Sequence, residues 1–172
     1  SFSEYREKGI IPEAMLNYLS RLGWSFGDQE IFDFEELVEK FKEGKMNSSP
    51  ASFSMDKLLW FNKQYLSGFK NKDLIRKLTE FSSHFKEDDY SLKVLDLIKE
   101  RCHLLSDYEE EAKYFFEDLE EINSRDENKI FNAEAISVLN ALLQEFSELD
   151  KWTSESIHNI VEMVMASFNL GM

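Results

Sequence analysis

Residues 1–30 read SFSEYREKGIIPEAMLNYLSRLGWSFGDQE, and this stretch decides the fold class of the first part of the chain. Pro12 suits the first position of a helix, because its φ is fixed and its missing amide hydrogen would have no partner there. Apolar residues follow at spacings of three and four, and Gly23 is a typical stop. The apolar positions are Ala14, Met15, Tyr18, Leu19 and Leu22. The pattern predicts a helix over about residues 12–22.

The remainder of the chain repeats the same helical pattern, so we expect an all-α fold. Polar residues that suit the N-cap position precede most apolar stripes. The expected caps are Asp33, Ser54, Asn132 and Thr153, with a capping box formed by Ser106 and Glu109. The helix after Asn132 has the clearest apolar face of the chain, and Gly171 is a plausible stop for the last helix. Loops are expected over about 42–53 and 120–129.

Composition limits the class of protein. The chain has 172 residues, 42% of them hydrophobic, and its six Gly and two Pro favour helices over a loop-rich β fold. The single Cys102 excludes an internal disulfide and fits a reducing, cytoplasmic location. No apolar run approaches the roughly 20 residues that span a bilayer. We therefore expect a cytoplasmic protein with no membrane partner.

Charge is unevenly distributed along the chain. The net charge of −14 argues against nucleic acid as a partner, because phosphate binding needs Lys and Arg. Residues 1–90 carry a net charge of −3, however, and residues 91–172 carry −11. Residues 57–77 hold one acidic side chain, Asp73, and six basic ones: Lys57, Lys63, Lys70, Lys72, Arg76 and Lys77. This run is either a basic patch or an ordinary solvated helix face.

No catalytic or metal-binding constellation is found. The three histidines, His84, His103 and His158, lie on separate predicted helices without a second ligand at metal-binding spacing. Cys102 beside His103 is interpreted as a core thiol next to a surface imidazole. Glycine-flanked serines and glycine-rich phosphate loops are missing, and the acidic run near residues 107–121 is read as a solvated helix face.

Several stretches resemble one known family. The segment Y-R-E-K-G-x-x-P-E-A-x-x-N-Y-L-x-R-L-G-W-S is similar to the stretch that follows the lysine-rich ATP loop of bacterial glutamyl-tRNA synthetases. SPASFSMDKLLWFNKQYL matches the family pattern S-P-A-x-F-x-x-x-K-L-x-W-x-N-x-x-Y. LIKERCHLLSDYEEEAKYFFED and WTSESIHNIVEMVMASFNLGM resemble later helices of the same family. The resemblance therefore extends over nearly the whole chain.

The resemblance implies a division of the chain and a function. Residues 1–68 would be the stem-contact domain that follows the KMSKS-type loop, and residues 69–172 the first anticodon-binding helical subdomain. The parent enzyme would be a glutamate–tRNA ligase that uses ATP and Mg to attach glutamate to tRNA. Neither a HIGH-type nor a KMSKS-type signature occurs here, so this part alone is predicted to be inactive and to need no cofactor. Its partners would be tRNA(Glu) and the N-terminal catalytic domain.

The resemblance also points to individual contact residues. Arg101 matches an arginine that approaches an anticodon base in some members, although it could equally serve as a cation at a helix C-terminus. Arg21 is a candidate contact to the tRNA or the catalytic loop. Lys57, Lys63 and Lys70 would be phosphate partners.

Two residues at positions of the family pattern each allow two roles. Asn62 and Tyr65 would contact tRNA, or they would hold two helices together. Trp60, Trp24 and Tyr18 are expected to be core anchors. A different interpretation of the whole chain is a stand-alone helical protein-interaction module, which the acidic second half and the Phe-rich stripes would suit.

Overall fold

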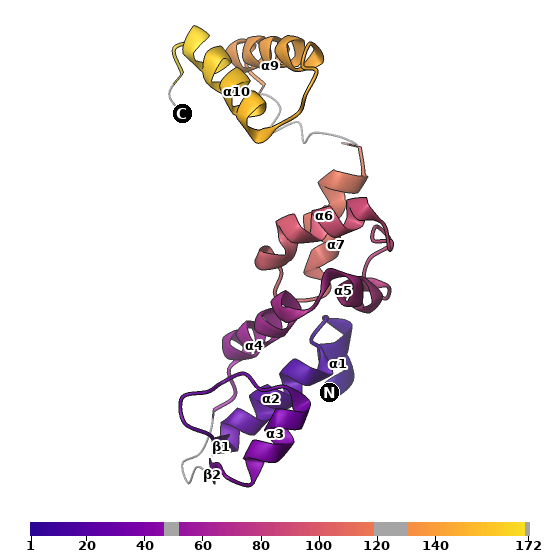
Figure 1. The fold of residues 1–172 in the computed structure, drawn as a ribbon, viewed down its shortest axis with the longest axis vertical. Coiled ribbons are helices and arrows are strands. Elements are labelled where there is room, and N and C mark those ends of the chain that lie inside the picture. The colour runs from indigo at the N-terminus through magenta and orange to yellow at the C-terminus, as the bar shows by residue number, and fades with distance from the viewer. Residues whose placement is uncertain (47–51, 119–130, 171–172) are drawn as a thin grey trace. The chain divides into compact units, whose positions relative to one another are not determined.

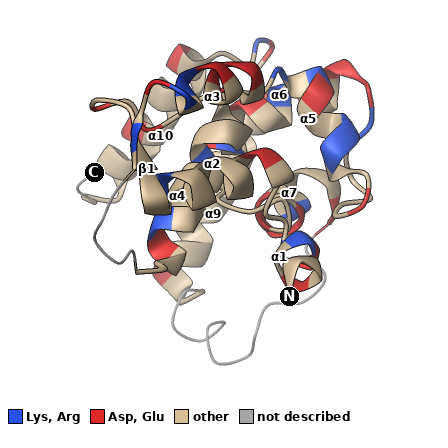
Figure 2. Ribbon diagram, turned by 90° about the horizontal axis from the view of Figure 1, so that it is seen from below, with Lys and Arg blue, Asp and Glu red and all other residues tan. Residues whose placement is uncertain are grey.

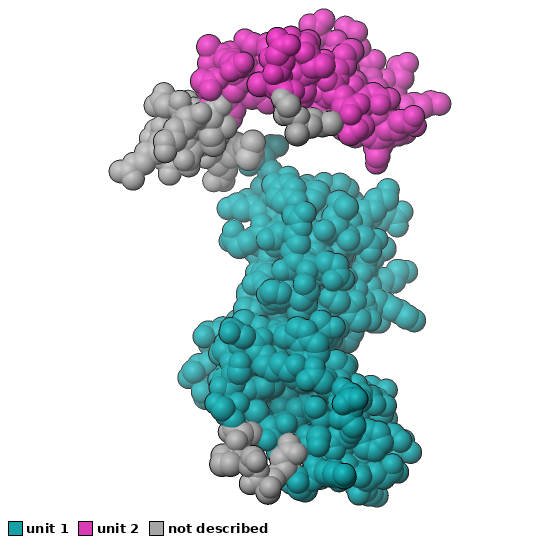
Figure 3. Space-filling view, turned by 90° about the vertical axis from the view of Figure 1, so that its left-hand side faces the viewer, with its two compact units in different colours: residues 1–118 teal, residues 119–172 magenta. Residues whose placement is uncertain are grey.

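The chain forms two compact units, Ser1–Asp118 (unit 1) and Leu119–Met172 (unit 2), coloured separately in Figure 3. The structure is a computed structural model, and it describes residues 1–46, 52–118 and 131–170. Nearly all of its regular structure is helical (Figure 1), which confirms the all-α prediction. No helix within the described residues is both long enough and apolar enough to cross a membrane.

Unit 1 consists of short helices joined by tight connections. The helices are α1 (Phe2–Glu7), α2 (Pro12–Gly23), α3 (Phe34–Phe41), α4 (Met55–Gly68), α5 (Asn71–Leu78), α6 (Asp89–Ile98) and α7 (Asp107–Phe116), with a 3₁₀ turn η1 (Lys99–Arg101). Two strands, β1 (Trp24–Ser25) and β2 (Lys45–Met46), pair antiparallel with Trp24 opposite Met46. The strands and α1 were not expected from the sequence.

The helix starts follow the capping residues. Pro12 occupies the beginning of α2 as predicted. The Asp33 carboxylate accepts a hydrogen bond from the Glu36 amide at 2.7 Å, and the Ser54 hydroxyl accepts one from the Lys57 amide at 3.3 Å. These bonds satisfy amide groups that have no partner within the helix.

The capping box predicted at Ser106 and Glu109 is wrong. The Ser106 hydroxyl donates to the Lys8 carbonyl at 3.0 Å and makes no cap bond to α7. Asp107 instead accepts hydrogen bonds from the His103 and Leu104 amides, at 2.8 and 2.9 Å. A tertiary contact has therefore displaced the local one.

The core of unit 1 lies where α2 crosses α4 and continues into α5, α6 and α7. One cluster of buried residues contains Ile10, Met15, Tyr18, Leu58 and Phe61. A larger one joins Ile11, Ala14 and Leu66 to apolar residues of the later helices. Packing is thus continuous across Gly68, where the sequence predicted a boundary between tRNA-contact domains. That functional division stays a prediction.

Two of the three predicted core anchors are buried. Tyr18 is 2% exposed and Trp24 is 1% exposed, which confirms the prediction for both. The backbone of Gly44 passes so close to Trp24 that a Cβ on Gly44 would lie 1.9 Å from the indole nitrogen. Trp60 is 37% exposed, so the prediction that it is a core anchor is wrong.

Unit 2 contains α9 (Ala133–Ser147) and α10 (Ser154–Ser167), which pack against each other. Both predicted caps are confirmed: Asn132 accepts from the Ala135 amide at 2.8 Å, and Thr153 exchanges hydrogen bonds with Ser156. The described apolar residues that are buried here are Val138 and Val164. The predicted loop at 120–129 and the stop at Gly171 lie outside the described residues.

Candidate nucleic-acid interface

The candidate interface is built on a buried junction made by Asn62 of α4. The Asn62 Oδ1 accepts from the Ile11 amide at 2.9 Å, and its Nδ2 donates to the carbonyls of Gly9 at 3.1 Å and His103 at 2.7 Å. The Leu105 amide also donates to the Gly9 carbonyl, at 3.1 Å. We call Gly9, Ile11, Asn62, His103 and Leu105 the Asn62 junction. It joins the chain before α2 to α4 and to the segment after η1.

Gly9 fits the junction because it has no side chain. Its φ is +89°, and a Cβ placed on it would lie 2.5 Å from the Leu105 nitrogen. Asn62 is completely buried and uses all its amide hydrogens. Asn62 thus holds segments of unit 1 together, and its predicted contact to tRNA stays a prediction.

Tyr65 also serves the frame of unit 1. Its hydroxyl contacts the Phe32 carbonyl and lies 2.8 Å from Asn17 Oδ1. Burial raises the pKa of the Tyr65 hydroxyl to about 12, and the negative charges of Glu13 and Asp33 act in the same direction. Tyr65 therefore stays neutral and connects α4 to the segment before α3.

Lys57 is largely committed within unit 1. Its Nζ lies 2.8 Å from both carboxylate oxygens of Glu30 and 4.0 Å from the centre of the Trp60 ring. The carboxylate of Glu30 therefore offsets the charge of Lys57 in the absence of RNA. Lys77 is similarly paired, 3.0 Å from Glu13, and Arg76 lies 3.3 Å from both Asp73 and Glu87. The carboxylates of Glu13, Glu30 and Glu87 come from outside residues 57–77, where a count along the sequence could not find them.

Other cations of the same run remain unpaired. Within the part of the chain that the structure describes, Lys63, Lys70 and Lys72 form no ion pair. Lys70 is exposed at the N-cap of α5, and Lys63 is half-buried on α4. Figure 2 shows basic segments on several helices of unit 1, interspersed with acidic ones. The basic run is thus neither a uniform patch nor a fully neutralised surface.

Arg101 and Lys63 both act on the pKa of Cys102. Arg101 ends η1, its side chain is 63% exposed, and its guanidinium lies 3.9 Å from Glu111. Burial raises the pKa of the Cys102 thiol to about 12, and the positive charges of Arg101 and Lys63 oppose this rise. Lys63 is far from Cys102 in sequence, whereas Arg101 directly precedes it. Cys102 is buried and His103 exposed, which confirms the interpretation of this pair.

Lys99 fixes the joint between α4 and α5 to the end of α6. Its Nζ donates to the Phe69 carbonyl and to Asn71 Oδ1, the latter at 3.2 Å. Burial lowers the pKa of its ammonium group, while Asp96 and Glu100 raise it. Sequence reasoning passed over Lys99, because its partners are backbone and amide oxygens about 30 residues away.

Arg21 lies in the last turn of α2 and is distant along the sequence from the residues described above. Its side chain is partly buried, and its Nη1 has no hydrogen-bond partner among the described residues. This nitrogen is itself buried, so its missing partner does not identify an external acceptor. The prediction that Arg21 is a contact residue stays open.

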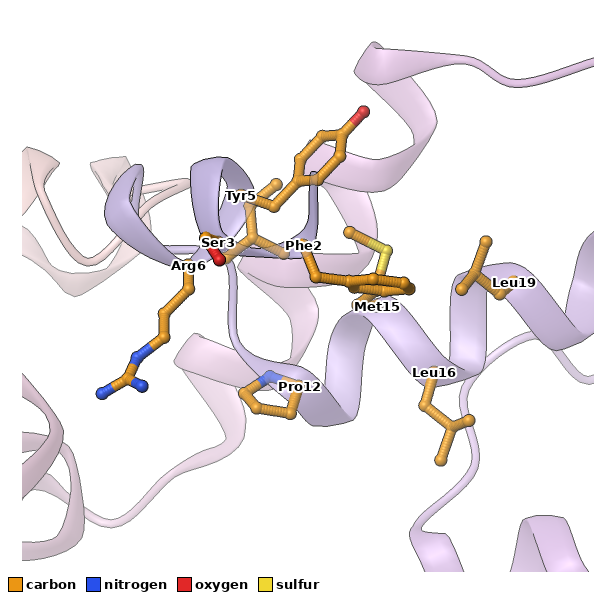
Figure 4. A pocket seen from close by; sticks show the side chains of 9 residues that line it. Phe2, Ser3, Tyr5, Arg6, Pro12, Met15, Leu16 and Leu19 are labelled. Atoms are coloured by element: carbon orange, nitrogen blue, oxygen red, sulfur yellow. The ribbon is translucent and has the colours of Figure 1, made fainter.

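A groove of a different character lies between α1 and α2. Its volume is about 390 Å³, and Figure 4 shows Phe2, Met15, Leu16 and Leu19 around it. Arg6 supplies the positive charge of the groove lining.

Among all the described residues, no group of three His, Cys, Asp or Glu side chains could hold a metal ion.

Two family models match the chain. The model described as an anticodon binding domain matches residues 73–172, and that of the catalytic domain of class I tRNA synthetases (E and Q) matches residues 1–60. Arg101 falls within the first match, whereas the Asn62 junction connects both matched parts through Gly9 and His103.

Two solved structures are similar over nearly the full chain. A glutamate tRNA ligase from Elizabethkingia meningosepticum has 30% identity and a TM-score of 0.82, with 97% of this chain and 34% of that one covered. A glutamate-tRNA synthetase from Elizabethkingia anophelis has 31% identity and a TM-score of 0.74, with 97% and 33% covered. The chain therefore spans about a third of the length of these relatives.

The helical architecture is that of the C-terminal helical domains of class I glutamyl-type synthetases, which confirms the resemblance found in the sequence. More narrowly, the chain belongs to the anticodon-binding domain family.

Proposed function

We propose that this chain is the tRNA-binding part of a glutamate–tRNA ligase and that it binds tRNA(Glu). The observation that carries the proposal is the match of residues 73–172 to the anticodon-binding family. The two similar ligase structures support the choice of glutamate as the amino acid of the parent enzyme. In this proposal the protein is cytoplasmic, and the N-terminal catalytic domain is its second partner.

The proposed division of labour places a boundary between the two family matches, although the model that matches residues 1–60 is described as a catalytic domain. Residues 1–68 contact the stem of the tRNA, and residues 69–172 form an anticodon-binding subdomain. Residues 61–72 lie between the two matched ranges, so a change of role near residue 68 is compatible with them. The Asn62 junction then holds the two functional parts at a fixed distance within unit 1.

The exposed cations supply the chemistry of binding. Lys63 and Lys70 would neutralise phosphates, which positions the RNA without reading its sequence. Arg101 would donate two hydrogen bonds to an unstacked anticodon base or stack on it, because its guanidinium is exposed and only loosely paired with Glu111. Asn62 and Tyr65 would act indirectly, by holding α4 in place.

The remaining predicted contacts are weaker in this proposal. Lys57 must exchange part of its contact with Glu30 for a phosphate. Arg21 would contact the RNA or the catalytic part through the exposed portion of its partly buried side chain, because its unpaired Nη1 is buried.

Catalysis is assigned to the parent enzyme and not to this chain. Neither a HIGH-type nor a KMSKS-type signature occurs in the sequence, so we assign the Mg–ATP site to the parent enzyme. We expect no ATP–pyrophosphate exchange with glutamate when this chain is assayed alone. Robust exchange would overturn the division between chemistry and tRNA binding.

Binding at two salt concentrations tests the proposal. The affinity of the chain for tRNA(Glu) should fall steeply between about 50 and 200 mM salt. Lys and Arg side chains release counterions from the phosphates on binding, and added salt opposes this release. Lys63→Ala should reduce the slope of log affinity against log salt concentration by about one. Lys113 lies on an acidic helix, 3.9 Å from Glu117, so Lys113→Ala should leave this slope unchanged. No binding at low salt would contradict the proposal.

Arg101→Ala provides the test at the anticodon. In the full-length ligase it should reduce discrimination against tRNA with altered anticodon bases by about 5- to 100-fold, the usual range for a bidentate contact. The melting temperature of the chain should change little, since the side chain is largely exposed. A large loss of stability with unchanged discrimination would make Arg101 a structural residue.

The exposed apolar faces favour a second candidate, a protein-interaction module. Ile136, Leu139 and Leu143 of α9 are 46, 47 and 67% exposed. Substitution of these residues should leave tRNA affinity unchanged if the first proposal holds.

A further inference from the structure

Trp60 is held in a fixed position although it is at the surface. It lies on α4 with 37% of its surface exposed, while its ring makes a perpendicular contact with Phe61 at 5.1 Å. The ammonium of Lys57 is 4.0 Å from the ring centre, and Glu30 holds that ammonium at 2.8 Å. An exposed indole with so many fixed neighbours loses little conformational entropy when a ligand binds to it.

Trp60 has two lysines three residues away on α4, Lys57 before it and Lys63 after it, and one carboxylate, Asp56, four residues before it. Lys63 follows Trp60 by three residues and Gln64 by four, so both lie beside it on α4. Lys63 forms no ion pair within the described ranges. The exposed indole thus borders Lys63, to which the proposed function assigns a phosphate contact.

Trp152 of unit 2 shows that exposure alone does not define such a site. It is 64% exposed and lies 5.4 Å from the Phe146 ring. Its neighbours in sequence include three carboxylates, Glu148, Asp150 and Glu155. Negative charge at this position repels phosphate, so Trp152 offers an aromatic surface of the same kind in the opposite electrostatic setting.

We propose that Trp60 is a stacking platform for one unpaired nucleotide of the bound tRNA. The base or ribose packs on the exposed part of the indole, and Lys63 neutralises the adjoining phosphate. Stacking of this kind tolerates any base, because every base presents a π-face. Trp60 would therefore strengthen and position tRNA binding without reading the sequence. This inference rests on the proposed function, since it names a further contact within the same interface.

Affinity measurements with the full chain and a tRNA(Glu) transcript test the contact. Trp60→Leu should weaken binding by about 5- to 150-fold, the range for loss of one base–aromatic stack, and Trp60→Phe should weaken it less. The salt dependence should be the same in both variants, because no charge is removed. Trp152→Leu is the matched control and should bind like the unaltered chain. Melting temperatures verify that each variant is folded.

Fluorescence separates stacking from a structural role. In a Trp152→Phe background, tRNA should quench the emission of Trp60 with the midpoint measured for binding, and Trp60→Phe should abolish this quenching. If tRNA binds but neither emission nor the affinity of Trp60→Leu changes, the inference is wrong and the proposed function stands. Weaker binding of Trp60→Leu without quenching in the background protein would make Trp60 a packing residue. If the unaltered chain binds no tRNA, the proposed function fails and the inference with it.

Discussion

The two units of the chain use the same kind of helix in different ways. In unit 1, apolar stripes from α2, α4, α5, α6 and α7 meet in clusters of fully buried residues, and buried amides connect distant segments. In unit 2, α9 also has an apolar stripe, yet Val138 is the α9 residue buried among those described. An amphipathic pattern therefore determines that a helix forms, whereas burial of its face depends on which other segments are available to cover it.

The largest expected effect comes from the Asn62 junction. Asn62→Ala removes hydrogen bonds to the Ile11 amide and to the Gly9 and His103 carbonyls, and leaves at least two of these groups buried without that partner. We expect the free energy of unfolding of unit 1 to fall by about 4 kcal/mol, since each orphaned group costs about 1–3 kcal/mol. Urea denaturation followed by Trp24 fluorescence measures this loss.

Gln64→Ala is the control for this variant. Gln64 lies on the same helix two residues away and is exposed, so its removal should change stability by less than about 0.5 kcal/mol. A comparable small effect for Asn62→Ala would show that the junction does not hold unit 1 together.

A pair of leucine truncations compares the units directly. Leu95 of α6 is fully buried, so Leu95→Ala should destabilise unit 1 by about 3 kcal/mol through lost burial and a residual cavity. Leu143 of α9 is 67% exposed, and Leu143→Ala should cost less than about 0.5 kcal/mol. Hydrogen exchange should register the first change across α4 and α6 amides and almost nothing in α9. Similar costs at both sites would indicate that the α9 face is covered in solution.

The stability of unit 1 should also depend on alkaline pH. The folded state raises the pKa of Cys102 from 9.0 and that of Tyr65 from 10.0, each to about 12, mainly through burial. Between about pH 9 and 12 the unfolded chain has therefore lost protons that the folded chain retains, and stability falls as pH rises. Urea midpoints measured across this range should decline.

Variants assign the alkaline decline to its groups. Cys102→Ala should flatten the fall that begins near pH 9, and Tyr65→Phe the part that begins near pH 10, even if each lowers stability at neutral pH. An unchanged slope in both variants would contradict the role of these two groups.

The local signals in the sequence were sufficient for much of the fold. Pro12, Asp33, Ser54, Asn132 and Thr153 mark helix starts because their effect is exerted within one turn. The prediction for Ser106 was wrong because its hydroxyl donates to the Lys8 carbonyl, which is 98 residues away in sequence. The prediction for Trp60 was wrong for a related reason. Its spacing placed it on a helix, but did not show whether other helices would cover it.

The candidate interface was less predictable than the fold. Lys63, Lys70 and Arg101 are recognisable as cations in the sequence, and the structure leaves the first two unpaired among the described residues. Lys57 and Lys77 are indistinguishable from free cations in the sequence, but Glu30, in the segment before α3, pairs with Lys57, and Glu13 of α2 pairs with Lys77. Whether a basic residue keeps its charge available is a tertiary property, and no count along the chain can supply it.

The close passage of Gly9 under Leu105 limits how this protein can be rebuilt from parts. The segment before α2 and the segment after η1 fall in two different family matches, yet a Cβ at residue 9 would lie 2.5 Å from the Leu105 nitrogen. A chimaera that exchanges residues 1–60 for those of a relative must therefore supply a glycine at position 9 and a carbonyl there that accepts from the Asn62 side-chain amide. The segment before α2 and the segment after η1 should therefore be exchanged together.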